Sequence, residues 1–112
     1  MAFEAEIRQL DGLAVMEMHG DIDGAADEPL NASYAEAIHG GPARVLLNFD
    51  HVSFINSTGI ALIVGLLAEA RGSGRTILAC GLTDHYKDIF EITRIVDFLT
   101  IVDDEQAAVA AT

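Results

Sequence analysis

Residues 46–60 read Leu46-Leu47-Asn48-Phe49-Asp50-His51-Val52-Ser53-Phe54-Ile55-Asn56-Ser57-Thr58-Gly59-Ile60. The chain from residue 44 to 49 has the continuous apolar character of a buried strand. Residues 50–55 are predicted to be a connecting loop with apolar anchors. From Ser57 to Arg71 the chain is strongly apolar, and the glycines that follow at 72 and 74 are typical of a helix end. The stretch therefore predicts a strand that leads through a short loop into a helix.

Further strand and helix patterns lie on both sides of this unit. Asp11-Gly12, a strong hairpin signal, separates two predicted strands at 3–10 and 13–19. A polar loop at 20–24 and a helix at 25–38 follow, and after residue 75 we expect a strand at 76–80, a helix at 85–92, a strand at 98–102 and a helix at 103–111. The whole chain, 1–112, is thus predicted to be a single α/β domain. Its mixed β-sheet would start with an antiparallel hairpin and continue in β-α-β units, with about four helices.

The composition limits the classes of partner. With 18 acidic and 6 basic residues the formal charge is −12, so the surface should repel nucleic acid and anionic membrane faces and suit a basic docking surface. The longest apolar stretch, residues 60–68, is about half of a membrane span, and the N-terminus lacks the pattern of a signal peptide. We therefore expect a cytoplasmic protein that binds neither nucleic acid nor membrane. The one cysteine, Cys80, ends an apolar run and is predicted to be a buried, inert thiol.

The start of the apolar helix carries the functional hypothesis. Small polar residues there have a structural explanation, since Asn56 or Ser57 can cap the free backbone donors of the first turn. The helix is nevertheless apolar on more than one face. Its predicted core stripe consists of Ile60, Ile63, Val64 and Leu67. Leu62 and Leu66 lie off this stripe, so they would form an exposed docking strip for a protein partner or for a second copy in a homodimer, unless a neighbouring helix or loop covers them.

The segment 46–60 resembles the central motif of STAS domains, which are the anti-sigma factor antagonists of bacteria and their relatives in sulfate transporters and stressosomes. Two further segments fit the same family. His19-Gly20-Asp21-Ile22-Asp23 is similar to the family's loop after the second strand, and Ile92-Thr93-Arg94-Ile95 fits near the end. The resemblance covers essentially the whole chain in the right order, so it implies a STAS-like fold.

The resemblance also implies a switch. In this family the serine that matches Ser57 is phosphorylated by a partner serine kinase that is itself an anti-sigma factor. The unphosphorylated antagonist binds that kinase and frees the sigma factor, and a PP2C-type phosphatase resets the phosphorylated form. Thr58 and Gly59 match the rest of the motif, while Asp23 matches a family aspartate near the phosphoacceptor and Asp21 takes the acidic place before it. Asn56 stands where the family usually has aspartate, which removes a charge but keeps a good helix cap.

The residues leave two other classes of function to consider. A STAS module that senses or assembles without phosphorylation is the main alternative, given Asn56 and the leucine strip. A small serine hydrolase with Ser57 as nucleophile is disfavoured, because Ile55 stands where a nucleophile elbow needs glycine and the spacing of His51 and His85 favours neither as a base. We expect no catalytic residue, no cofactor and no metal site, since the four histidines lack the paired spacing of zinc ligands.

Overall fold

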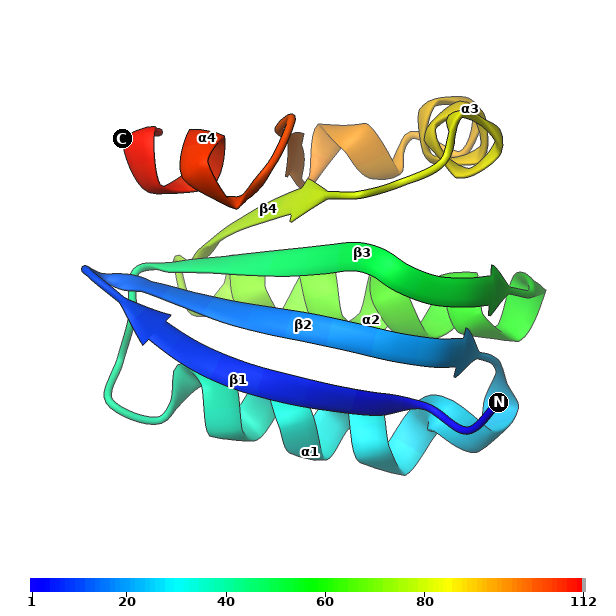
Figure 1. Cartoon of the computed structure of the whole chain (residues 1–112), viewed down its shortest axis with the longest axis horizontal. Coiled ribbons are helices and arrows are strands. Elements are labelled where there is room, and N and C mark those ends of the chain that lie inside the picture. The colour runs from blue at the N-terminus through cyan, green and yellow to red at the C-terminus, as the bar shows by residue number, and fades with distance from the viewer. Residues whose placement is uncertain (112) are drawn as a thin grey trace.

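The computed structural model describes residues 1–111, which form a five-stranded sheet, four α-helices and two short 3-10 helices (Figure 1). The strands are β1 (Glu4–Leu10), β2 (Leu13–Ile22), β3 (Arg44–Ile55), β4 (Thr76–Cys80) and β5 (Thr100–Ile101). The helices are η1 (Gly24–Ala26), α1 (Asp27–Ile38), α2 (Ser57–Gly72), α3 (Asp84–Ile92), η2 (Ile95–Asp97) and α4 (Glu105–Ala110). The described chain contains no helix that is both long and apolar enough to cross a membrane.

The sheet has the strand order β1-β2-β3-β4-β5, with β1 and β2 antiparallel and every later pair parallel. Leu10 pairs with Leu13 across the predicted Asp11-Gly12 turn, and Gly12 has a φ of 75°, which glycine adopts without steric cost. The predicted hairpin and the mixed α/β sheet are therefore confirmed.

Figure 1 shows α1 and α2 along one face of the sheet, and the short α4 packs on part of the other face. On one face, α1 and α2 contribute Leu30, Tyr34, Ile63 and Leu67 to the larger core cluster, which contains Met16 and Leu47 of the central strands. On the other face, Ala108 of α4 packs in a smaller cluster with Leu13, Val15, Leu46, Leu78 and Cys80. The predicted burial of Cys80 is confirmed, and this burial raises the pKa of the thiol to about 11, which disfavours the reactive thiolate.

The predicted loop at residues 50–55 is wrong, because β3 continues to Ile55. This part of β3 pairs in parallel with the end of β2, with His19 opposite His51 and Ile22 opposite Ile55. Two register shifts interrupt the pairing, and they break the simple alternation by which a strand is recognised in a sequence. As a result His19 and His51, 32 positions apart in the printed sequence, stack with ring centroids 4.8 Å apart.

Elements near the C-terminus are shorter than predicted. The predicted strand at 98–102 is reduced to Thr100–Ile101, and Phe98 instead lies exposed just after η2. The predicted helix at 103–111 begins at Glu105, since the Asp104 side chain accepts a hydrogen bond from the Ala107 N–H at 2.8 Å and caps it. The N-cap is thus the second residue of the acidic run Asp103-Asp104-Glu105.

Side chains of the sheet tether α4. The Glu105 carboxylate accepts hydrogen bonds from both terminal amino groups of Arg8 on β1 and from Asn48 Nδ2 on β3, the last at 2.8 Å. Asn48 is the buried polar side chain of the described core. The Arg8 hydrogen bond, together with that of Asn48, lowers the pKa of Glu105, against the opposing effect of its burial.

Glu105→Gln is expected to lower the free energy of unfolding at pH 7 by about 1 kcal/mol, since the ion pair is partly exposed. Because the pKa of Glu105 is lower in the folded than in the unfolded chain, its charge stabilises the fold above the ordinary pKa of 4.5, and this contribution is lost as the pH falls through the folded-state pKa. Urea unfolding from pH 7 to pH 3 should therefore show the two proteins converging in acid. If the difference in free energy of unfolding stayed constant with pH, the charge of Glu105 would not be its cause. Glu36→Gln, on the exposed side of α1, is the matched control.

Candidate functional site

The candidate site lies where β2 and β3 end and α2 begins, at one edge of the sheet (Figure 1). Ile22 and Ile55 are the last paired residues of the two strands. Beyond them, the Asn56 N–H donates a 3.3 Å hydrogen bond to the Ile22 carbonyl. The parallel pairing therefore brings the end of β2, with Asp21, and the turn with Asp23 near the start of α2, although more than 30 residues separate them in the printed sequence.

Asn56 is the cap of α2. Its side-chain oxygen accepts the Gly59 N–H at 2.8 Å, which settles the choice between Asn56 and Ser57 that the sequence left open. Ser57 is the first residue of the helix and is exposed. Within residues 1–111 its hydroxyl makes no hydrogen bond to protein, so this hydroxyl is available at the surface beside the free backbone donors of the first turn.

Gly59 is required by a close approach between α2 and β2. A Cβ atom at this position would lie 1.8 Å from the Ile22 carbonyl oxygen, which is far inside any van der Waals contact. The next loop also lies close, because a Cβ on Gly24 would be 3.7 Å from Cγ2 of Thr58. Gly59 thus has a packing role: it lets the helix start sit directly on the end of β2.

The two aspartates are half-buried, and each has a structural partner. Asp21 Oδ2 accepts a 2.7 Å hydrogen bond from the Met1 amino group, and this contact raises the pKa of that amine. Asp23 Oδ1 accepts the Ala25 N–H at 3.0 Å and caps η1. Asp21 therefore lies in β2, which runs to Ile22, and only Asp23 lies in the turn before η1. The predicted loop at 20–24 is wrong to this extent, because β2 continues in parallel pairing with the end of β3.

The predicted leucine strip is wrong. Leu66 is only 2% exposed and Leu62 is half-buried against the core, whereas Val64, assigned to the core stripe, is 47% exposed and Ile60 is half-buried. The buried residues of α2 are Gly59, Ile63, Leu66, Leu67 and Ala70. The helix is apolar nearly all round, so its sequence contains more than one apolar stripe with helical spacing. The observed buried stripe and the predicted core stripe are two of them. The packing of α2 against the sheet and α1 decides between them.

Sequence reasoning missed two residues near Ser57. Phe54 is 50% exposed at the end of β3 and is a large apolar side chain close to the candidate site. Tyr86 of α3 accepts the Ile55 N–H on its hydroxyl at 2.9 Å and holds the end of β3. An aromatic residue three positions before the serine was visible in the sequence, but its exposure depends on the tertiary structure.

The histidines do not assemble around Ser57. His51 stacks on His19, and His85 lies beside Tyr86 with ring centroids 5.0 Å apart. No imidazole of the described chain is hydrogen-bonded to Ser57. Possible metal-ligand atoms of Glu6, Glu17 and His19 lie within 4.8 Å of one another on the sheet. Groupings of this kind are common on acidic surfaces, so we assign no metal to them.

The chain matches a known protein family. Residues 4–108 match the family model of the STAS domain. The chain belongs to the STAS domain family. A relative in Bordetella bronchiseptica, named BtrV and described as a candidate anti-sigma factor antagonist, is 25% identical over 103 residues, which cover 92% of this chain and 89% of BtrV.

Solved STAS structures share the fold. The chain superimposes on the anti-sigma factor antagonist SpoIIAA in its unphosphorylated form with a TM-score of 0.74, at 20% identity, covering 95% of this chain and 94% of that one. The phosphorylated form of SpoIIAA from Bacillus matches with a TM-score of 0.72, at 19% identity, covering 95% and 97% of the two chains. These likenesses confirm the STAS fold predicted from the motif at residues 46–60.

Proposed function

We propose that this STAS domain is a non-enzymatic, cytoplasmic switch, an anti-sigma factor antagonist that binds an anti-sigma serine kinase while Ser57 is unphosphorylated. Phosphorylation of Ser57 by that kinase ends the binding, and a PP2C-type phosphatase restores it. Ser57 is the phosphoacceptor, and Asp21, Asp23, Asn56, Thr58 and Gly59 shape its surroundings. The name of BtrV and the fold of SpoIIAA support this assignment.

One observation carries the proposal: Asn56 caps α2, so the exposed Ser57 hydroxyl has no structural task among the described residues. A side chain needed as the cap could not be modified without loss of the helix start. A phosphate on Ser57 would instead sit at the N-terminus of a 16-residue helix, where the dipole and free N–H groups favour an anion. The fold should therefore tolerate the modification.

The switch would act through charge. A phosphoserine carries about −1.5 to −2 charges, and these charges would have to lose water when the partner covers them. The backbone that carries Asp21 and Asp23 contacts the start of α2 through Ile22 and Gly24, so the phosphate would add to the negative charge of this region. A hundredfold loss of partner affinity requires about 2.7 kcal/mol, which charge and desolvation at an interface can supply without a change of shape.

Incubation with the cognate kinase and ATP tests the proposal. Intact-mass analysis should show one added phosphate in the wild type, one in Thr58→Ala and none in Ser57→Ala. Thr58→Ala is the matched control because it removes the neighbouring exposed hydroxyl. A phosphate that persists in Ser57→Ala would contradict the site. Ester hydrolysis that is lost in Ser57→Ala would favour the hydrolase class instead.

A further inference from the structure

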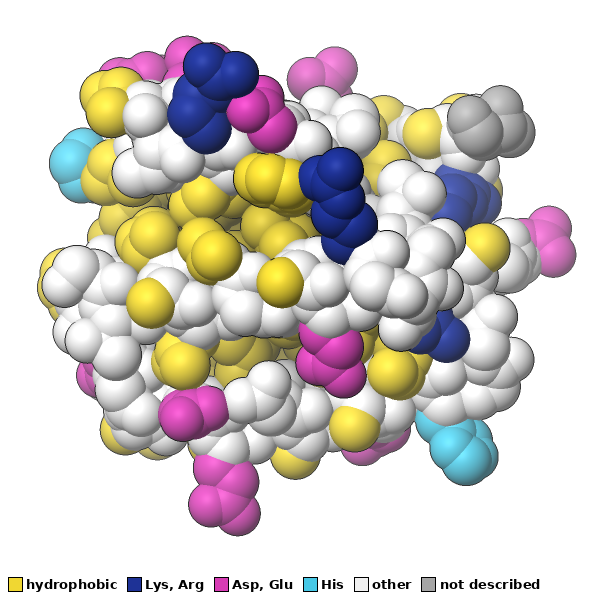
Figure 2. Space-filling view, turned by 180° about the vertical axis from the view of Figure 1, so that it is seen from behind, with side chains coloured by type: hydrophobic (Ala, Val, Ile, Leu, Met, Phe, Trp, Pro, Cys, Tyr) yellow, Lys and Arg dark blue, Asp and Glu magenta, His cyan; other side chains and the backbone are white. Residues whose placement is uncertain are grey.

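A groove runs along the C-terminal half of α2, away from Ser57. One wall is α2, with Val64, Leu67 and Arg71, and the other is formed by the chain around η2, with Arg94, Ile95 and Phe98. We call this the α2–η2 groove. Its volume of about 420 Å³ falls in the range of small-molecule sites. Figure 2 shows the hollow as a band of hydrophobic side chains with basic side chains at its edge.

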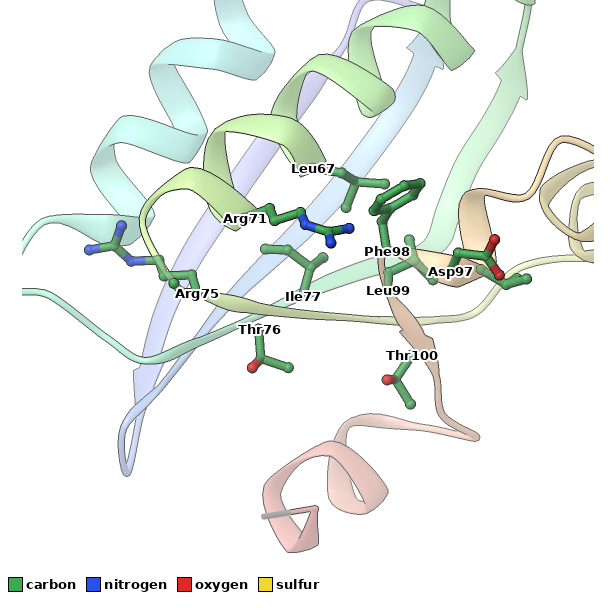
Figure 3. Close-up of a pocket in the computed structure, with 11 residues that line it drawn as sticks. Leu67, Arg71, Arg75, Thr76, Ile77, Asp97, Phe98, Leu99 and Thr100 are labelled. Carbon is green, nitrogen blue, oxygen red and sulfur yellow. The ribbon is translucent and has the colours of Figure 1, made fainter.

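The charge of the groove is opposite to that of the protein. Basic residues number only 6 in a chain with a net charge of −12, yet two arginines, Arg71 and Arg94, line the groove. The guanidinium of Arg71 lies over the Phe98 ring, 5.1 Å from its centroid, at the boundary with a second hollow of about 460 Å³ (Figure 3). In that view Arg71 and Phe98 face one another from opposite walls. The acidic Asp97 lines the second hollow and not the α2–η2 groove.

Arg94 adopts a conformation that glycine normally takes. Among residues 1–111 it is the one non-glycine residue with a positive φ, 65°, and it stands just after the C-cap of α3, where glycine is common. Its Nε donates to Asp97 Oδ2 at 2.9 Å, while the side chain remains 77% exposed. Glycine would relieve the strain, so the backbone alone gives no reason for arginine here.

We propose that the α2–η2 groove binds a small anionic amphiphile, a molecule with one carboxylate or similar acid group on an apolar body. The apolar part would lie against Val64, Leu67, Ile95 and Phe98, and the acid group would meet Arg71 and Arg94. A compact ligand with a single charge is favoured over an acidic protein segment, because spread negative charges would face the repulsion of the remaining surface. This inference does not depend on the proposed function of Ser57.

The test uses decanoate and decylammonium, which share an apolar chain and carry opposite charges, with backbone amide NMR as readout. Decanoate should give saturable shifts confined to residues 64–72 and 93–98 and should bind at least tenfold tighter than decylammonium. The overall field of a protein with charge −12 favours the cation, so preference for decanoate must come from the local arginines. Equal or tighter binding of decylammonium, or no saturable binding of decanoate, overturns the proposal.

Arg94→Gly separates binding from folding. It should weaken decanoate binding about tenfold while leaving the melting temperature equal or higher, since glycine relieves the positive φ. Lys87→Gln on α3 removes the same charge outside the groove and should leave the affinity unchanged. Unchanged affinity in Arg94→Gly overturns the proposal. So does a concentration-dependent dimer that Val64→Glu disrupts and that decanoate does not dissociate, because a second copy would then be the occupant.

Discussion

Gly59→Ala is expected to lower the free energy of unfolding by about 2 kcal/mol. The new Cβ would lie 1.8 Å from the Ile22 carbonyl oxygen, which is backbone and cannot swing aside. Relief requires α2 to move off the end of β2, and this would strain the hydrogen bond from the Asn56 N–H to the same carbonyl. Alanine favours a helix over glycine by up to about 1 kcal/mol, so the clash must exceed that gain. Urea unfolding of the wild type and Gly59→Ala measures the net change in the free energy of unfolding.

Gly65→Ala is the matched control. Gly65 lies in the same helix, is exposed, and has no atom within 4 Å of a Cβ built on it. Here only the helix preference acts, so the free energy of unfolding should rise by about 0.5–1 kcal/mol. Opposite signs for the two substitutions identify the contact with Ile22 as the cause. Equal stabilisation by both would show that α2 can shift freely, and that Gly59 has no packing role.

Ser57→Glu is expected to weaken binding to the proposed anti-sigma kinase at least a hundredfold while the fold stays intact. The added carboxylate places a charge at the start of α2, and this charge would have to lose water when the partner covers it. The same charge interacts favourably with the helix N-terminus by about 0.3–1 kcal/mol, so the melting temperature should not fall. Calorimetric titration and thermal unfolding of the same preparation give both quantities.

Ser73→Glu controls for net charge. Ser73 is the exposed C-cap of α2, so the substitution adds an identical charge at the other end of the same helix. Kinase binding should persist in this variant, although the helix dipole there disfavours an anion and slightly lowers stability. Loss of binding in both variants would point to a general effect of charge on association and would remove the special role of Ser57.

Exposed Phe54 lies at the end of β3, three residues before Ser57 in the chain. Under the proposed function it would be an apolar group of the partner interface, where aromatic side chains contribute most. The charge switch would then act at the edge of an apolar contact. A phosphate there would have to be desolvated on binding, which adds to the repulsion from acidic groups.

Many features of the fold and the site could be predicted from the sequence because they depend on residues close together in the chain. The cap of α2, the turn at Asp11-Gly12 and the end of α1 before Gly40-Gly41 each depend on a few consecutive residues. The order of strands and helices follows from similar short patterns, and it specifies a mixed sheet since crossover helices join parallel strands. The motif around Ser57 pointed to the STAS family on the same local grounds.

Three features depend on partners that are distant along the chain. Residues 50–55 are a strand because the end of β2 pairs with them, and two register shifts hide this in the sequence. Leu66 is buried and Val64 exposed because α1 and the sheet select one side of a helix that is apolar nearly all round. The α2–η2 groove exists because the chain after α3 turns at Arg94 and runs beside α2.

The amino-acid sequence by itself determined the order of the strands and helices, the hairpin turn, and a polar helix start that holds Asn56 and Ser57. Hydrogen bonds and turn conformations within a few residues decide these features, and no distant contact is needed. The tertiary structure alone decided which face of α2 is buried, how far β3 extends, and that two arginines meet an apolar groove. Such features arise from packing and pairing between segments far apart in the chain, where several local patterns are equally acceptable until the partner surface selects one.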